Sequence, residues 1–325
     1  MAAKSPLNVI LGAGNIGNSA IDQTARFDTP DQVNGFINAF YNRGYHQIDT
    51  ASAYSPHAPG SSEPRLGAVD AGKRFLIDTK VRSRPGDHKK EEIQKNVDEQ
   101  LEALKIEQIN IEYLHQPDRS VPFEETLESL DQAYRQGKFK KLGLSNYSAA
   151  DVEQINEICE RRGFVKPSVY QGQYNAIVRG GETELFPVLR KYNIAFYAWS
   201  PAAGGFFANN YKKAEPGGRF DPNLPLGKLY SSYYLKPSIE KAKDSVGELA
   251  AKHGINTHAA ALRWTVYHSI LSNKYDDAVV IGASSSEQLV QSLDMIEAGP
   301  LSEDLVRALD SLYEQVAGDE ILYHR

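Results

Sequence analysis

The fold prediction rests on residues 44–54, Gly44-Tyr45-His46-Gln47-Ile48-Asp49-Thr50-Ala51-Ser52-Ala53-Tyr54. This stretch is typical of a short strand that ends at Asp49 and is followed by an isolated tyrosine, Tyr54. Taken alone, an aspartate at a strand end is commonly a turn former or a helix cap. Two later strands end in residues of comparable chemistry, Lys80 after 75–79 and His115 after 109–114. These side chains form one site only if their strands are parallel and adjacent.

Strand-like and helix-like segments alternate along the chain of 325 residues. In segment 89–104, for example, Ile93, Val97, Leu101 and Leu104 recur at helical spacing. Further strands are predicted at 139–145, 168–171, 194–200 and 278–281, and an eighth is expected near Leu11 or in a less regular stretch. Helices are predicted at 62–71, 89–104, 122–136, 149–161, 182–191, 238–253, 256–271, 286–298 and 303–316.

This repetition favours an α/β fold, a (β/α)8 TIM barrel that forms a single domain over residues 1–325. In such a barrel all strand carboxyl ends meet at one face, so Asp49, Lys80 and His115 are expected to converge there with Tyr54. Residues 201–237 break the alternation, since they show no periodicity and are rich in glycine, proline and tyrosine. We interpret them as a long active-site loop whose aromatic residues argue against disorder.

One motif supports a different fold. Gly12-Ala13-Gly14-Asn15-Ile16-Gly17 follows a predicted strand and matches the glycine fingerprint of a Rossmann domain. The fingerprint requires a helix that opens at the glycines, and Pro30 would break it. Residues 29–31 instead resemble the start of a new helix that buries Val33, Phe36, Ile37 and Phe40. The motif is therefore interpreted as a set of turn glycines, and the Rossmann alternative is disfavoured.

The composition excludes several functional classes. The net charge is −6 and no basic run exceeds two residues, which argues against a nucleic-acid partner. The single cysteine, Cys159, excludes a disulfide scaffold and a cysteine metal site, and no metal is expected. No apolar stretch approaches the roughly 20 residues that span a bilayer, and the N-terminus is not typical of a secretory signal. We expect a cytoplasmic protein without a membrane partner; a homodimer is left open.

The four converging side chains suit proton donation to an oxygen atom. A tyrosine phenol has a pKa of about 10, and a neighbouring ammonium group favours its ionised form. Lys80 could supply that charge, Asp49 could fix Lys80 by an ion pair, and His115 could orient a carbonyl oxygen. Because no cysteine nucleophile, metal cluster or serine triad is apparent, the simplest attacking group is a hydride from a nicotinamide.

The sequence resembles the aldo-keto reductases over nearly its whole length. The motifs that carry the resemblance are residues 44–51 with Tyr54, 79–80, 113–117, 143–147, 171–175, 197–201 and 281–284. The resemblance implies a catalytic tetrad of Asp49, Tyr54, Lys80 and His115, with Tyr54 as the acid/base. It further implies cofactor contacts from Ser145, Asn146 and Gln171 at the nicotinamide carboxamide, Trp199 at its ring, Ser200, Ala202 and Gly204 at the pyrophosphate, and Ser284, Gln288, Gln291 and Ser292 at the adenosine.

Within the family, residues 203–205, 218–220 and 283–289 are most similar to the aflatoxin-aldehyde reductase branch, and also to the potassium-channel β-subunits. Where those relatives often carry Gly-Lys-Tyr near the 2′-phosphate, this chain has Asn209-Asn210-Tyr211, so Arg219 is the main phosphate candidate. The resemblance implies NADPH as cofactor, with NADH still open. Residues 229–234 lack the arginines that would bind a carboxylate, which favours an uncharged carbonyl substrate. The alternative function is a cofactor-sensing regulatory subunit with weak catalysis.

Overall fold

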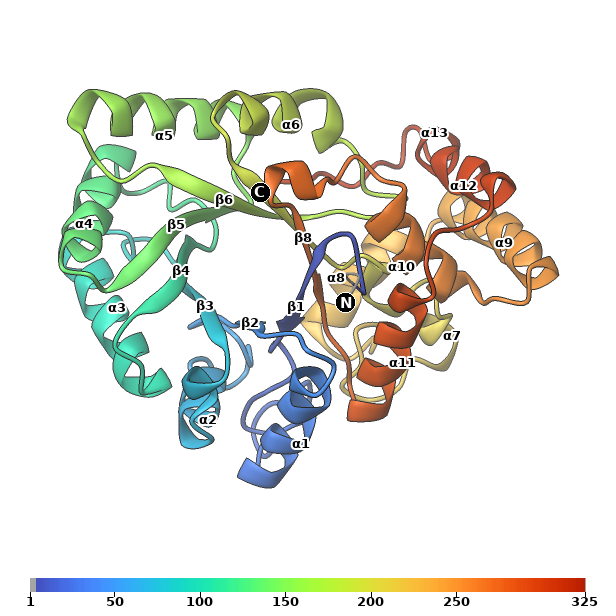
Figure 1. Cartoon of the computed structure of the whole chain (residues 1–325), viewed down its shortest axis with the longest axis horizontal. Coiled ribbons are helices and arrows are strands. Elements are labelled where there is room, and N and C mark those ends of the chain that lie inside the picture. Colours follow the sequence, from blue (N-terminus) through green and yellow to red (C-terminus); the bar gives the residue numbers. More distant parts are fainter. Residues whose placement is uncertain (1–3, 325) are drawn as a thin grey trace.

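The core of the molecule is a closed barrel of parallel strands, as the computed structural model of residues 4–324 shows (Figure 1). Strand β1 pairs with β8 as well as with β2, so the ring has no free edge. This confirms the predicted (β/α)8 barrel. The eighth strand, which the sequence left unassigned, is β1 and contains Leu11. The strands are β1 (Asn8–Gly12), β2 (Gln47–Asp49), β3 (Leu76–Val81), β4 (Ile109–Leu114), β5 (Phe139–Ser145), β6 (Pro167–Gln173), β7 (Ala195–Trp199) and β8 (Ala278–Ile281).

Helices surround the strands, and most of them bury apolar side chains in the hydrophobic core (Figure 1). The helices between strands are α1 (Pro30–Tyr41), α2 (Ser62–Ala68), η1 (Ala71–Lys73), α3 (Lys90–Leu104), α4 (Phe123–Arg135), α5 (Ala149–Arg162) and α6 (Gly181–Lys191). Those between β7 and β8 are η2 (Ala203–Gly205), α7 (Asn210–Lys213), α8 (Pro225–Tyr234), α9 (Pro237–Lys252), α10 (Thr257–Tyr267) and η3 (Asn273–Tyr275). The last helices are α11 (Ser286–Glu297), α12 (Glu303–Asp310) and α13 (Leu312–Gln315).

The connection from β1 to α1 contains turns where a Rossmann domain would have a helix. Helix α1 begins only at Pro30, where the Thr29 side chain accepts a hydrogen bond from the Gln32 amide in a capping box. Its buried face consists of Val33, Phe36, Ile37 and Phe40, as predicted. The Rossmann alternative is therefore excluded: Gly14 lies in a turn and Gly17 at a bend, whereas Gly12 is the last residue of β1.

The long loop predicted at 201–237 is present as the connection from β7 to α9, but it is not irregular throughout, and one predicted helix is not continuous. Residues 201–237 contain helices, including the ten-residue α8. Their aromatic side chains pack on one another, with the Phe206 and Tyr234 rings 5.4 Å apart, so tertiary packing supports a helix that sequence periodicity does not reveal. The C-terminal helix predicted at 303–316 is divided, because α12 ends before Ser311 and α13 begins at Leu312.

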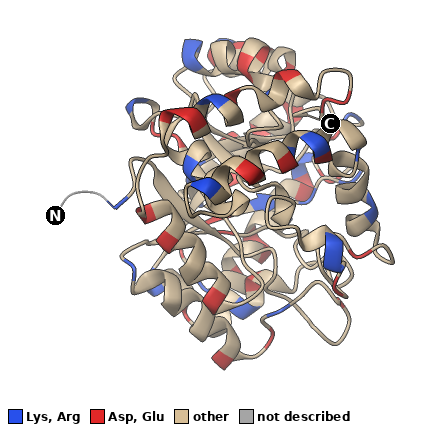
Figure 2. Ribbon diagram, turned by 90° about the vertical axis from the view of Figure 1, so that its right-hand side faces the viewer, with Lys and Arg blue, Asp and Glu red and all other residues tan. Residues whose placement is uncertain are grey.

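The surface carries charges of both signs. Figure 2 shows basic and acidic residues interspersed along the helices of that view, without a continuous basic face. The C-terminal segment returns to the barrel, where the backbone N–H of Ala149 donates to the Tyr323 hydroxyl at 3.2 Å. This contact ties the end of the described chain to the start of α5.

Candidate active site

Three neighbouring strands deliver the predicted tetrad to the carboxyl end of the barrel. Asp49 is the last residue of β2, Lys80 precedes the last residue of β3, and His115 directly follows β4. The register pairs Asp49 with Asp78 and Lys80 with Tyr113, so Lys80 and His115 each lie two positions beyond the partner of the preceding strand's site residue. The side chains thus meet because the strands are parallel and consecutive in the ring.

A buried ion pair lies at the centre of the site. Lys80 Nζ donates to Asp49 Oδ1 and Oδ2 at 2.6 and 2.7 Å and to the Thr50 carbonyl at 2.8 Å. The side chains of Lys80 and Asp49 are each only 1% exposed. The Tyr54 hydroxyl donates to Asp49 Oδ2 at 3.1 Å and accepts from Lys80 Nζ at 3.2 Å. Tyr54 is therefore held by the charged pair.

The pKa of Tyr54 is shifted in the opposite direction to the sequence-based expectation. Burial and the charge of Asp49 raise the pKa of Tyr54 to about 12, and the opposing effect of Lys80 is smaller. The expectation of a net decrease was wrong, because the sequence does not reveal how far the hydroxyl is desolvated. Burial also opposes a charge on Lys80, but Asp49 and Tyr54 outweigh it and raise the pKa of Lys80. Near neutral pH, Tyr54 is protonated and Lys80 is charged.

Aromatic rings enclose the ion pair. The Tyr54 and His115 rings lie edge to face with centroids 6.1 Å apart. Lys80 Nζ lies 5.5 Å from the centroid of the Tyr113 ring, beneath the site. The Tyr113 ring fits there because residue 143 is glycine: a Cβ on Gly143 would lie 2.2 Å from it. Packing inside the barrel thus helps to fix the position of the Lys80 side chain.

A cavity of about 1260 Å³ opens above the tetrad. It exceeds the roughly 300–1,000 Å³ usual for drug-sized ligands, so it has room for a dinucleotide. Lys80 lies behind Tyr54 and Asp49 and is the one predicted site residue that does not line the cavity. The predicted residues that line it are Asp49, Tyr54, His115, Ser145, Asn146, Gln171, Trp199, Ser200, Ala202, Gly204, Arg219, Ser284, Gln288, Gln291 and Ser292.

The side chains expected at the nicotinamide carboxamide are bonded to the tetrad. Gln171 Nε2 donates to Asp49 Oδ1 at 2.7 Å. Asn146 Nδ2 donates to the His115 carbonyl at 2.8 Å and to Ser145 Oγ at 3.1 Å. A ligand amide bound to these groups would be positioned relative to Tyr54 by the same network. The donor set therefore fits a nicotinamide placed beside Tyr54.

Comparison with known proteins supports the resemblance to the aldo-keto reductases. The Aldo/keto reductase family model matches residues 8–314. The chain is an aldo-keto reductase. It is 41% identical to an aldo-keto reductase of Pseudocercospora fijiensis, over 86% of this chain and 97% of that protein. It is 38% identical to human aldo-keto reductase family 7 member A3 (94% and 96% covered) and 36% identical to human aflatoxin B1 aldehyde reductase member 2 (92% and 86% covered).

Membership confirms the family resemblance and the assignment as an oxidoreductase that reduces carbonyl compounds with a nicotinamide cofactor. Between residues 4 and 324, the reductase has no helix long and apolar enough to cross a membrane. The same residues contain no group of three or more His, Cys, Asp or Glu side chains arranged to hold a metal ion.

Sequence reasoning missed part of the cavity wall. Gly14, Asn15 and Arg26 line the cavity of the reductase, although the glycine motif was interpreted only as turns. Asn15 Nδ2 donates to the Ala283 carbonyl at 2.9 Å, and Asn15 Oδ1 accepts from Arg219 at 3.3 Å. The available signal was position, because the loop after β1 must face the same end of the barrel as the tetrad.

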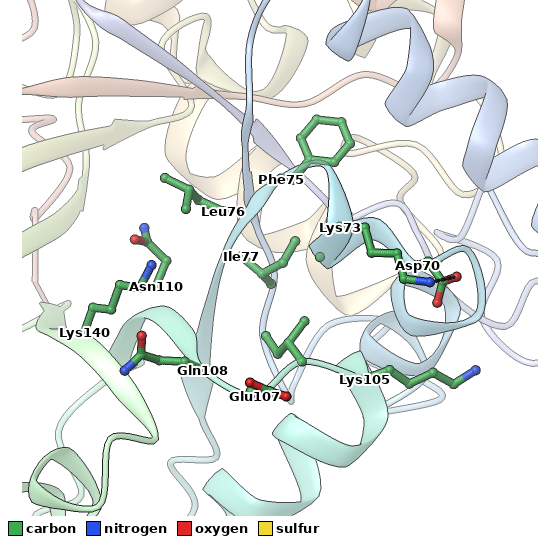
Figure 3. A pocket seen from close by; sticks show the side chains of 12 residues that line it. Asp70, Lys73, Phe75, Leu76, Ile77, Lys105, Glu107, Gln108, Asn110 and Lys140 are labelled. Carbon is green, nitrogen blue, oxygen red and sulfur yellow. Dashed lines mark hydrogen bonds and ion pairs between the residues drawn. The ribbon is translucent and has the colours of Figure 1, made fainter.

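A second cavity of about 280 Å³ lies at the start of β3, at the opposite end of that strand from Lys80. Figure 3 shows Lys73 and Lys105 on one side of it and Lys140 on the other. Lys73 is paired with Asp70 at 2.7 Å, and no tetrad residue lines this cavity. The amino end of a TIM barrel usually serves stability, so the chemistry is assigned to the large cavity.

Proposed function

We propose that this aldo-keto reductase uses NADPH to reduce an aldehyde or ketone to an alcohol, with Tyr54 as the proton donor. The observation that supports this role is the Tyr54 hydroxyl at the cavity wall, bonded to both Asp49 and Lys80. Because the pKa of Tyr54 is about 12, its proton is present in the resting enzyme. A donor is thus in place before a substrate arrives.

When bound, the nicotinamide supplies a hydride to the carbonyl carbon. The chain performs the remaining tasks. Tyr54 donates its proton to the carbonyl oxygen, and charged Lys80, 3.2 Å away, stabilises the phenolate that remains. Asp49 holds Lys80 in place, and His115 orients the carbonyl oxygen by a hydrogen bond from the opposite side of the pocket.

The long loop at residues 201–237, which we call the lid, favours an uncharged, aromatic substrate. The aromatic side chains that line the cavity together with Tyr54 include Trp199, Phe207, Tyr230 and Tyr233. Such rings bind apolar and aromatic groups well and offer no charge to a substrate carboxylate. Arg219 also lines the cavity, and we assign it to the 2′-phosphate of the cofactor. Because only NADPH carries that phosphate, this assignment favours NADPH over NADH.

The decisive experiment combines a carbonyl panel with one substitution. We expect NADPH oxidation with uncharged aromatic aldehydes and much slower turnover of their carboxylate-bearing analogues. Tyr54→Phe should lower kcat by about 10²–10⁴-fold, the usual contribution of a positioned acid, and leave NADPH binding intact. Tyr134→Phe on the outer helix α4 is the matched control and should retain full activity. Undiminished turnover by Tyr54→Phe would exclude its role as the acid.

A further inference from the structure

A group of buried polar side chains, which we call the buried polar cluster, lies between the outer side of β3 and β4 and the helices α2 and α3. Its members are Ser52, Glu63, Thr79, Gln100 and Glu112, none of which is more than 4% exposed. They come from five separate segments and do not line the large cavity. Two of them are carboxylic acids, so the cluster requires an account of its protons.

The orientation of Gln100 is fixed by its neighbours. Gln100 Nε2 donates to the Lys80 carbonyl and to Ser52 Oγ, both at 3.0 Å. A carbonyl oxygen can only accept, so the amide nitrogen must face Lys80 and Oε1 must face away from it. Thr79 Oγ1 donates to Glu63 Oε1 at 2.5 Å, and Ser52 Oγ donates to Glu63 Oε2 at 3.4 Å. Glu63 is thus an acceptor at both oxygens.

Three atoms of the buried polar cluster have no hydrogen-bond partner among the described residues: Gln100 Oε1, Glu112 Oε1 and Glu112 Oε2. Neither Glu63 nor Glu112 forms an ion pair with any described residue, although both are buried. A buried carboxylate without a partner is costly, and so is an acceptor without a donor. A proton on Glu112 removes both costs, because a neutral carboxyl group can donate to Gln100 Oε1.

We propose that Glu112 is protonated in the folded reductase and, by donating to Gln100, acts as a positioning residue for Lys80 and the Tyr54 loop. Hydrogen bonds then run in one direction, from Glu112 through Gln100 and Ser52 to ionised Glu63. A proton on Glu63 alone would not help, because Gln100 Oε1 would still lack a donor. The assignment thus accounts for both the orphaned amide oxygen and the orphaned acid.

The surroundings of Glu112 agree with this assignment. Burial and the charge of Glu63 on α2 raise the pKa of Glu112 well above its usual range. Lys80 on β3 acts in the opposite direction, as do the Gln100 side chain and the Val81 backbone where they donate to an ionised Glu112, and these effects are outweighed. Arg82 is the cation that acts on Glu63, and burial nevertheless raises the pKa of Glu63.

The cluster is connected to the catalytic groups through the backbone. The Lys80 carbonyl accepts from the Ser52 amide at 3.1 Å as well as from Gln100. Ser52 precedes Tyr54 by two positions, so this junction joins the strand of the lysine to the loop of the tyrosine. Loss of the Glu112 proton frees Gln100 to rotate and loosens the junction. This inference rests on the proposed role of Tyr54.

Two substitutions separate the proton from the volume of the side chain. Glu112→Gln keeps a donor toward Gln100 and cannot ionise, whereas Glu112→Met fills similar space without a donor. We expect Glu112→Gln to retain kcat within about twofold and Glu112→Met to lower kcat about tenfold or more, as small displacements of catalytic groups do. The dissociation constant for NADPH should be unchanged in both, because the cluster does not line the cavity.

A second readout requires no turnover. Between the ordinary carboxyl pKa and the raised one, the folded protein holds the Glu112 proton and the unfolded chain does not, so stability falls as pH rises. Thermal unfolding of the wild type across this range should show that fall, and Glu112→Gln should show a smaller one. An unchanged slope in Glu112→Gln, or equal kcat in the two variants, would overturn the proposal. If no carbonyl is turned over, the slope still decides it separately from the proposed function.

Discussion

The two walls of the cavity differ in how firmly their side chains are held. On the β2–β4 wall, Lys80, Asp49 and Tyr54 are joined by hydrogen bonds of 2.6–3.2 Å. On the lid wall, Lys243 holds Asn209, but the side chains assigned to phosphate contacts are held more weakly: Arg219 has one bond of 3.3 Å to Asn15, and the Ser200 and Tyr230 hydroxyls are also 3.3 Å apart. The lid and its approach also place non-glycine residues in the left-handed region at Ser200, Ala203, Asn209 and Ala214.

This difference separates chemistry from recognition. Groups that transfer a proton must be held close to the reactive geometry, and the barrel strands provide that rigidity. Groups that recognise the cofactor and the substrate can lie on a strained, adaptable segment. Substitutions on the strand wall should therefore affect kcat and stability, whereas substitutions on the lid should affect binding and selectivity.

The largest effect is expected from Lys80→Met. It leaves Asp49 charged and buried without its partner, which typically costs about 3–5 kcal/mol of stability. It also removes the charge that stabilises the Tyr54 phenolate, so kcat should fall by at least about a hundredfold. Urea denaturation and steady-state kinetics measure the two losses.

The double variant Asp49→Asn, Lys80→Met is the matched control. Removing both charges should restore much of the lost stability, because no unpaired ion remains buried, but it should not restore kcat. Recovery of activity in the double variant would mean that the ion pair does not support Tyr54.

The sequence contained enough information for the barrel and the tetrad, because their signals are local. Asp49, Lys80 and His115 each end a short strand, and regular βα alternation places such ends together. Contacts between residues far apart in the chain could not be predicted from the sequence. Gln171 bonds to Asp49 across 122 positions, and no motif indicates that contact. Nor did the sequence reveal the desolvation that raises the pKa of Tyr54 to about 12.

A smaller effect, confined to binding, is expected from Arg219→Ala on the lid wall. If Arg219 binds the 2′-phosphate, the dissociation constant for NADPH should rise about 10–100-fold, as for loss of a charge-assisted hydrogen bond. The value for NADH should change little. Fluorescence titration with both cofactors measures this, and exposed Arg307→Ala on α12 is the control.

Position gives this test a second informative outcome. A Cβ placed on Gly14 would lie 3.4 Å from an Arg219 guanidinium nitrogen and 4.0 Å from the Tyr54 ring. Arg219 therefore stands near the catalytic end of the cavity. Equal weakening of NADPH and NADH would contradict the 2′-phosphate assignment and place Arg219 at the pyrophosphate that both cofactors share.

The smallest effect on binding and turnover is expected at Asp78, which lies inside the strand wall and is fully buried. Its carboxylate accepts from Gln47 Nε2 and Asn110 Nδ2, both at 2.7 Å. Burial, aided by the charge of Asp49, raises the pKa of Asp78 to about 7 despite the Asn110 amide. The folded protein thus binds this proton more tightly than the unfolded chain, and stability should fall as pH rises from about 4 to 7.

Asp78→Asn cannot ionise, so it should flatten that fall, by about 2–4 °C in Tm for each kcal/mol of stability. One amide donor loses its acceptor in this variant, and Asn110, which is only half-buried, can rotate to relieve it. The pH range distinguishes this effect from that of Glu112, because Asp78 should contribute nothing further above about pH 7. If the dependence of Tm on pH is the same in Asp78→Asn as in the wild type, then Asp78 stays ionised in the folded protein over the whole pH range. The strand wall would then contain no buried carboxyl proton at Asp78.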